Sequence, residues 1–236
     1  MNKYDDIKSI YREYGKYYRL LKSRQEVEEK IVEINSICRE YGINGGKRYY
    51  SDGFTINDDM SINVHGSVRL SRKRLDQLPL KFKKIDGSFD CSNNLLFNLD
   101  GSPEIVKFNF SCGNNDINSL KGGPKIVERD FSCVNNQLTS LEGCPEVIGG
   151  GLYCSNNKIT SFEGLPEFFE QKIIAINNPI NEIYKLFKED SRCIYWIREF
   201  GAIQGDEVVR DRLEEVYYTL GMDIPKDIKL ENYKLV

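Results

Sequence analysis

Residues 131–145 read FSCVNNQLTSLEGCP, and residues 152–166, 21 positions later, read LYCSNNKITSFEGLP. The same period continues on both sides of this pair. It relates Gly-x-Pro steps, Asn-Asn pairs and a series of cysteines, namely Cys91, Cys112, Cys133 and Cys154. A repeat of about 20–29 residues with this pattern predicts a solenoid, in which each coil buries its apolar side chains only against its neighbours.

Apolar residues return at five positions of each coil, and equivalent positions form columns along the stack. Phe110 and Cys112 alternate with Asn109, Ser111 and Gly113, which predicts a short half-buried strand. Columns in register are what stacked coils need to bury their interior. The expected columns are Ile85–Val106–Val127–Ile148–Phe169, Phe89–Phe110–Phe131–Leu152–Ile173, Cys91–Cys112–Cys133–Cys154–Ala175, Leu96–Ile117–Leu138–Ile159–Ile180 and Leu99–Leu120–Leu141–Phe162–Ile183.

The second Asn of each pair falls inside a turn, where the backbone cannot satisfy its own hydrogen bonds. We expect its amide to point inward and to serve backbone groups of its own coil and of the neighbouring coil. Leaving such buried groups unpaired costs ~1–3 kcal/mol each. The expected structural ladder is Asn94, Asn115, Asn136, Asn157 and Asn178. The Gly-x-Pro step then turns the chain on the convex side.

The pattern Phe110-x-Cys112-x-x-Asn115-x-Ile117 resembles the leucine-rich repeat, L-x-L-x-x-N-x-L. More narrowly, the phrases FDCSNN, FSCVNNQLTSLEGCP and LYCSNNKITSFEGLP are similar to short leucine-rich-repeat proteins of tailed bacteriophages and some bacteria. The resemblance covers about residues 53–190. It implies an α+β repeat solenoid, a right-handed coil with one parallel sheet whose outward face is concave.

The two ends are expected to cap the stack, because terminal coils would otherwise expose core. Residues 3–21 have the apolar spacing of an amphipathic helix, and a capping box at Ser23–Glu26 predicts a second helix that ends at Gly42. We therefore expect a helical hairpin in residues 1–52. A β-hairpin cap, a divergent first coil and the 21-residue repeats follow in residues 53–180. Residues 181–236 should form a helical cap, with Asp206 capping its third helix.

Composition is that of an ordinary soluble protein, with 236 residues, 40% hydrophobic and 29% charged. The first residues lack the apolar core of a signal peptide, and no run of 18 apolar residues predicts a membrane span. Seven cysteines without a CxxC pair, four of them in one buried column, favour reduced thiols. We therefore expect a cytoplasmic protein, in the host cell cytoplasm if a phage encodes it, and no membrane partner.

Candidate catalytic chemistry is sparse. The single histidine, His65, precedes a glycine turn and is expected on the solvated surface. Cys193 lies in an aromatic helix, where packing is favoured over a nucleophilic role. Gly149–Gly151 stands inside the repeat, which favours a bend or a close contact rather than a phosphate-binding loop. We expect no enzymatic activity, no cofactor and no metal site.

The surface of the sheet therefore carries the functional hypothesis. The outward column is Arg69, Asp90, Ser111, Ser132, Tyr153 and Ile174, with Asp130 and Val134 in flanking columns. Early coils present small polar groups, whereas later coils present apolar ones, and exposed apolar clusters mark interfaces. Two alternatives stay open at Ile174 and Ile176, since the C-terminal helices either cover them or leave them free. The partner-binding residues expected are Tyr153, Val134, Asp130, Ser132, Ser111, Asp90 and Ile174.

A second hypothesis rests on charge. Seven basic residues and one acid lie between Arg69 and Lys84, and the core of this basic edge is Arg69, Arg72, Lys73 and Arg74. Such an edge suits nucleic acid or an acidic protein, although it is equally a solvated first coil. The main hypothesis is a non-enzymatic, phage-related interaction protein that binds a host protein, such as a defence component, or a virion protein. The alternatives are a nucleic-acid accessory protein and a structural particle component. The sequence leaves the oligomeric state open.

Overall fold

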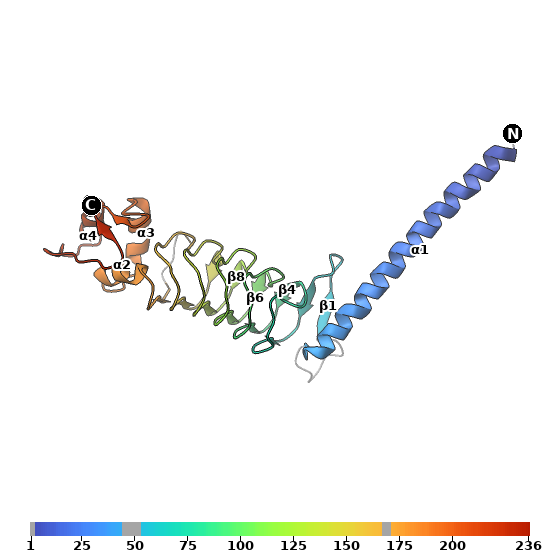
Figure 1. Ribbon diagram of the computed structural model, residues 1–236, viewed down its shortest axis with the longest axis horizontal. Coiled ribbons are helices and arrows are strands. Elements are labelled where there is room, and N and C mark those ends of the chain that lie inside the picture. The colour runs from blue at the N-terminus through green and yellow to red at the C-terminus, as the bar shows by residue number, and fades with distance from the viewer. Residues whose placement is uncertain (1–2, 44–52, 167–170) are drawn as a thin grey trace.

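The computed structural model describes the backbone of residues 3–43, 53–166 and 171–236, and the side chains of these ranges from Lys22 onward. A long helix, α1 (Lys3–Glu40), leads into a β-solenoid of about five turns, and a small helical unit follows it (Figure 1). The coils repeat every 21 residues, since each strand pairs in register with the strand 21 residues later, as in Phe89↔Phe110 and Phe110↔Phe131.

Two six-stranded sheets run along the stack where the sequence predicted one. Both are parallel apart from β1, which pairs antiparallel with β2. Sheet A contains β1 (Phe54–Ile56), β2 (Ile62–Val64), β4 (Phe82–Ile85), β6 (Ile105–Val106), β8 (Ile126–Val127) and β10 (Val147–Ile148). Sheet B contains β3 (Val68–Arg69), β5 (Phe89–Asp90), β7 (Phe110–Ser111), β9 (Phe131–Ser132), β11 (Leu152–Tyr153) and β12 (Ile173–Ile174).

The second sheet changes the expected shape of the binding face. Neighbouring strands lie about 4.8 Å apart in any sheet, so both sides of the stack rise by the same amount per coil. Figure 1 accordingly shows coils that follow one another along a nearly straight axis. Sheet B is therefore a flat ladder rather than the inner wall of a curved solenoid.

The interior of the stack consists of the apolar columns. Phe89, Phe110 and Phe131 are fully buried, and their rings stack at centroid distances of 5.5 and 5.4 Å. Phe82 meets Phe89 edge to face at 5.0 Å, which joins the sheet A side of the core to the sheet B side. Phe169, expected in the column of Val106, lies outside the described residues.

The amide of the second Asn in each pair bridges three coils. Asn136 is buried, and its Oδ1 accepts the Ile117 backbone N–H at 3.0 Å. Its Nδ2 donates to the Cys133 carbonyl of its own coil and to the Cys112 carbonyl of the preceding coil, each at 3.1 Å. The same bonds recur at Asn94, Asn115, Asn157 and Asn178.

The first Asn of each pair has a different role. Asn93, Asn114, Asn135, Asn156 and Asn177 all adopt a left-handed backbone, with φ between 55° and 58°. Asn tolerates this region better than other residues with a Cβ, which accounts for its recurrence. In the first coil Arg72 occupies the equivalent position with φ 59°, so this turn stores backbone strain that the Asn turns avoid.

The N-terminal helical hairpin is not formed, because α1 continues through the expected break. The segment between its two apolar stretches contains no Gly or Pro, and a capping box alone does not interrupt a helix that can propagate. The helix does end before Gly42 (φ 64°), where Ile43 N–H donates to the Cys38 carbonyl at 2.8 Å in a Schellman closure. Ile34, Cys38 and Ile43 are buried against the solenoid core.

The C-terminal unit is mixed rather than purely helical. Helices α2 (Ile180–Leu186), α3 (Arg192–Glu199) and α4 (Arg210–Thr219) are joined by β13 (Ile203–Gln204), β14 (Glu207–Val208) and β15 (Lys234–Leu235). Asp206 does not cap α4, because it lies in the β13–β14 hairpin turn and its carbonyl accepts the Lys234 N–H. The unit packs on the last coil through Phe162 and Tyr184, whose rings meet edge to face at 5.8 Å.

Replacing Asn136 with Ala should destabilise the protein by about 2 kcal/mol or more, because three buried backbone groups lose their partner. Asn118→Ala is the matched control, since Asn118 is exposed and belongs to no ladder; it should cost about 0.5 kcal/mol or less. Urea unfolding followed by circular dichroism measures both. Equal losses would contradict the structural role of the ladder.

Cys112 should resist alkylation in the native protein even at pH 9. Burial raises the pKa of its thiol to about 12, so almost no thiolate forms at a pH where an exposed cysteine is half ionised. All seven cysteines are free and buried, and denaturation should release all seven for labelling. Mass spectrometry of the labelled protein counts them, and fast labelling of native Cys112 would contradict its place in the core.

Candidate functional site

The outward column of sheet B changes character along the stack. Arg69 is exposed in the first coil, and Asp90, Ser111 and Ser132 are half-buried in the following coils. Asp90 is engaged locally, since its Oδ1 accepts the Ser92 hydroxyl at 2.6 Å and the Ser92 N–H at 3.0 Å. The polar half of the predicted binding face is therefore low and partly satisfied by its own hydrogen bonds.

Tyr153 lies along the sheet instead of projecting from it. A Cβ atom built on Gly151 would be 3.0 Å from Tyr153 Cε2 and 3.2 Å from the Tyr153 hydroxyl oxygen. The ring thus covers the backbone of Gly151, which is buried, while Tyr153 itself stays half-buried. The neighbouring glycine gives the aromatic ring a fixed seat with one side turned outward.

Val134 has a similar seat one coil earlier. A Cβ atom on Gly113 would lie 2.9 Å from Val134 Cγ2, so the valine side chain fills the space that Gly113 leaves empty. Val134 is half-buried and Gly113 is buried. Both large side chains on this face are thus matched to a glycine beside them.

Val134, Tyr153, Ile174 and Ile176 form what we call the apolar patch. Tyr153 pairs directly with Ile174 across β11 and β12, and Ile176 follows two residues later on the same face. Ile176 is 55% exposed, so the C-terminal helices leave it uncovered and Ile174 remains half-buried. This decides the alternative that the sequence left open, and the patch is accessible.

Asp130 is committed to a second ladder on the edge of sheet B. Gly151 N–H donates to its Oδ1 at 2.8 Å, and Asp130 N–H in turn donates to Asn109 Oδ1 at 3.2 Å. Ser88 and Ser67 continue the series toward the first coil. Each side chain accepts the backbone N–H of the equivalent residue 21 positions later. Asp130 therefore supports the seat of Tyr153 and retains its second oxygen at the surface.

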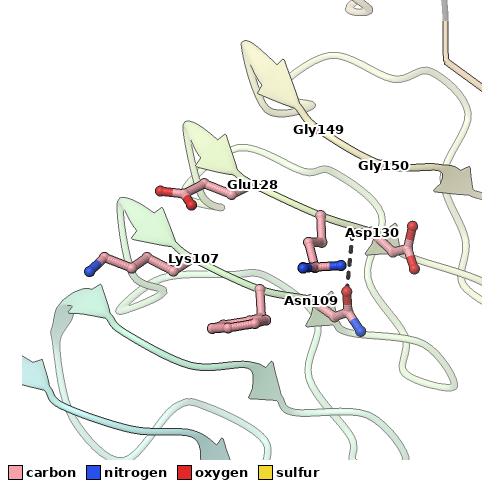
Figure 2. Close-up of a pocket in the computed structure, with 8 residues that line it drawn as sticks. Lys107, Asn109, Glu128, Asp130, Gly149 and Gly150 are labelled. Atoms are coloured by element: carbon pink, nitrogen blue, oxygen red, sulfur yellow. Dashed lines mark hydrogen bonds between the residues drawn. The ribbon is translucent and has the colours of Figure 1, made fainter.

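A groove of about 530 Å³ opens beside this edge (Figure 2). Phe108, 44% exposed, lines it with the Arg129 guanidinium 5.4 Å above its ring, and Gly149 and Gly150 form a wall without side chains. A Cβ on Gly149 would approach the Glu128 carbonyl oxygen to 2.1 Å, so close contact between coils requires glycine there. Asp130 lines the groove and borders the patch, which makes the two features continuous.

Charges on the outer rim of the groove neutralise one another. Lys107 Nζ lies 2.9 Å from Asp86 Oδ1, and His65 Nδ1 lies 3.2 Å from Asp86 Oδ2. The hydrogen bond from Lys107, with a smaller contribution from His65, lowers the pKa of Asp86 to about 2. These residues and Glu128 occupy equivalent positions of successive coils. His65 is thus part of a charged column along the stack.

The basic run from Arg69 to Lys84 does not form one edge. Arg69 lies in β3 of sheet B, and Arg72, Lys73 and Arg74 are exposed in the turn that follows it. Lys81, Lys83 and Lys84 lie in or next to β4 of sheet A, on another side of the coil. Two of these lysines are paired, Lys81 with Asp59 at 2.9 Å and Lys84 with Asp86 at 3.5 Å.

Sequence reasoning found the column that contains Tyr153 but missed the groove and the edge ladder. The signal for the ladder was present, because Ser67, Ser88, Asn109 and Asp130 all carry a hydrogen-bond acceptor at the 21-residue period. The signal for the seats was a glycine beside each large outward residue. The groove had no signal, since it depends on how the glycine segment approaches the coil before it.

Among the described residues, no three His, Cys, Asp or Glu side chains gather as metal ligands would. Within the same ranges, none of the helices combines the length and the apolar character needed to cross a bilayer. No protein-family model matches the sequence, and comparisons with curated proteins and with solved structures find no match.

Proposed function

We propose that this protein is a non-enzymatic binding module that holds a protein partner on the apolar patch of sheet B. The observation that carries the proposal is the exposure of Ile176 next to Tyr153 and Ile174 on a flat, regularly hydrogen-bonded sheet. Exposed apolar clusters of this kind mark interaction surfaces. Because the side chains are already held by their seats and by the sheet, a partner orders little on binding.

The surroundings of the patch suit an interface with an apolar centre and a polar rim. Ser132 and Ser155 flank Tyr153, and Asp130 offers a carboxylate oxygen at the edge of the groove. A partner that inserts an apolar side chain over Ile176 and donates a hydrogen bond near Asp130 satisfies this arrangement. Tyrosine is also enriched among residues that dominate binding energy.

The resemblance to leucine-rich repeats adds context to the proposal. The repeat period of the solenoid and the FSCVNN and LYCSNN phrases support a place among the short leucine-rich-repeat proteins of phages and bacteria. We accordingly propose an intracellular protein of a phage-infected or bacterial cell, with a host or virion protein as partner. The accessible patch favours this function over polyanion binding, because the basic residues are divided between two sides of the stack.

Replacing Tyr153 with Ala should weaken binding of the partner at least tenfold, because the ring supplies the aromatic centre of the patch. Ile176→Ser should weaken it as well, whereas Tyr153→Phe should bind nearly normally. Val147→Ser is the matched control, since Val147 is an equally exposed apolar residue on sheet A. Affinity is measured by calorimetry with a partner recovered from the source cell, alongside the melting temperature of each variant.

The opposite pattern would identify the alternative function. If Arg72→Glu/Arg74→Glu abolishes binding while Tyr153→Ala has no effect, the apolar patch is not the site. A steep loss of affinity between low and moderate salt would then indicate a polyanionic partner, because bound counterions are released only from such a partner.

A further inference from the structure

Helix α1 is attached to the solenoid only at its C-terminal end. Ile34 and Cys38 are 1% exposed, whereas Val27 and Val32 are 42% and 68% exposed. Every side chain from Lys22 to Lys30 is exposed. Figure 1 shows the remainder of the helix leading away from the coils, with the N-terminus at its far end. More than half of a 38-residue helix thus extends beyond the body of the protein.

A helix in this position needs a partner. Helices in proteins gain most of their stability from packing an apolar face, not from intrinsic propensity. The composition of α1 gives little compensation, since Gly15 is in its middle and its sequence is rich in tyrosine. The sequence does contain an apolar seam, with spacings of three and four residues, formed by Tyr4, Ile7, Tyr11, Tyr14, Tyr18 and Leu21. That spacing is typical of helices that pair side by side.

Charge along α1 is divided between its two halves. Residues 3–24 contain seven Lys or Arg and three Asp or Glu, whereas residues 25–40 contain five Glu and two Lys or Arg. Two parallel copies would place like charge beside like charge. Two antiparallel copies place the basic half of one helix beside the acidic half of the other, which is favourable in both halves.

We propose that α1 pairs with α1 of a second copy of this chain in an antiparallel arrangement. The apolar seam of one N-terminal half then covers the stripe of Val27 and Ile31 on the other helix. The best match places Tyr11 opposite Val27 and Ile7 opposite Ile31. An overlap from residue 4 to residue 34 spans about 45 Å at 1.5 Å per residue.

The continuous helix explains why the two stripes meet between chains. Within one chain, residues 3–21 and 23–40 would pair only if the helix folded into a hairpin, and α1 is unbroken across that point. The same contacts then form with a second copy, as in domain swapping. The two solenoids lie at opposite ends of the helix pair, so each apolar patch on sheet B remains free.

Sedimentation equilibrium of the full chain tests the proposal, with twice the chain mass expected at tens of micromolar. Lys8→Glu/Arg12→Glu should shift the protein to monomer by removing the charge match. Glu26→Lys/Glu29→Lys should do the same. The chain that carries all four changes should dimerise again, because its halves are complementary once more. A monomeric native chain, or no recovery in the fourfold variant, overturns the proposal.

Cross-linking tests the orientation. The seven native cysteines are buried, so a new cysteine on α1 reacts selectively. A mixture of Tyr11→Cys chains and Val27→Cys chains should form a disulfide-linked pair under mild oxidation, whereas each chain alone should not. A strong cross-link from Tyr11→Cys alone indicates parallel helices and overturns the antiparallel arrangement. Far-UV circular dichroism verifies that each variant keeps its helix content.

Discussion

The buried asparagine amide in each turn is the interaction on which the structure depends. A chain that turns every 21 residues leaves backbone groups facing the interior at every turn, and a side chain with both a donor and an acceptor can satisfy them. Asn136 bonds to backbone groups of its own coil and of the preceding coil, so it holds position within the coil and register between coils at once. The columns of phenylalanine and cysteine pack tightly because this register is constant.

Constant register on both sides of the coil determines the shape of the surface. With strands in sheet A as well as in sheet B, the stack rises equally on the two sides and sheet B remains flat. On a flat sheet, large outward side chains have no curvature to shelter them. Tyr153 and Val134 instead lie over Gly151 and Gly113, which fixes them in place and leaves one side of each available. The binding surface is thus prepared by small residues as much as by large ones.

The two ends of the solenoid close its core by different means. At the C-terminal end, aromatic contacts and the hydrogen bonds from Arg198 to the Leu165 and Pro166 carbonyls fasten a compact unit to the last coil. At the N-terminal end, Ile34, Cys38 and Ile43 cover the first coil, and the same helix then extends outward. One end therefore only seals the core, whereas the other also offers a long helix for assembly.

The sequence by itself determined the period, the inward columns and the residues that stand in each turn, because these depend on local spacing that repeats without interruption. It also identified Tyr153 as the exceptional residue of its column. Tertiary structure alone decided the rest. Sheet A arises from two-residue bridges that carry no period-2 pattern of their own, and the joining of α1 depends on a capping signal that competes with helix propagation. Whether Ile176 is covered depended on where α2 to α4 pack, and the seat of Tyr153 depended on how closely Gly151 approaches its ring. These are distances between segments, and a pattern along one chain does not encode them.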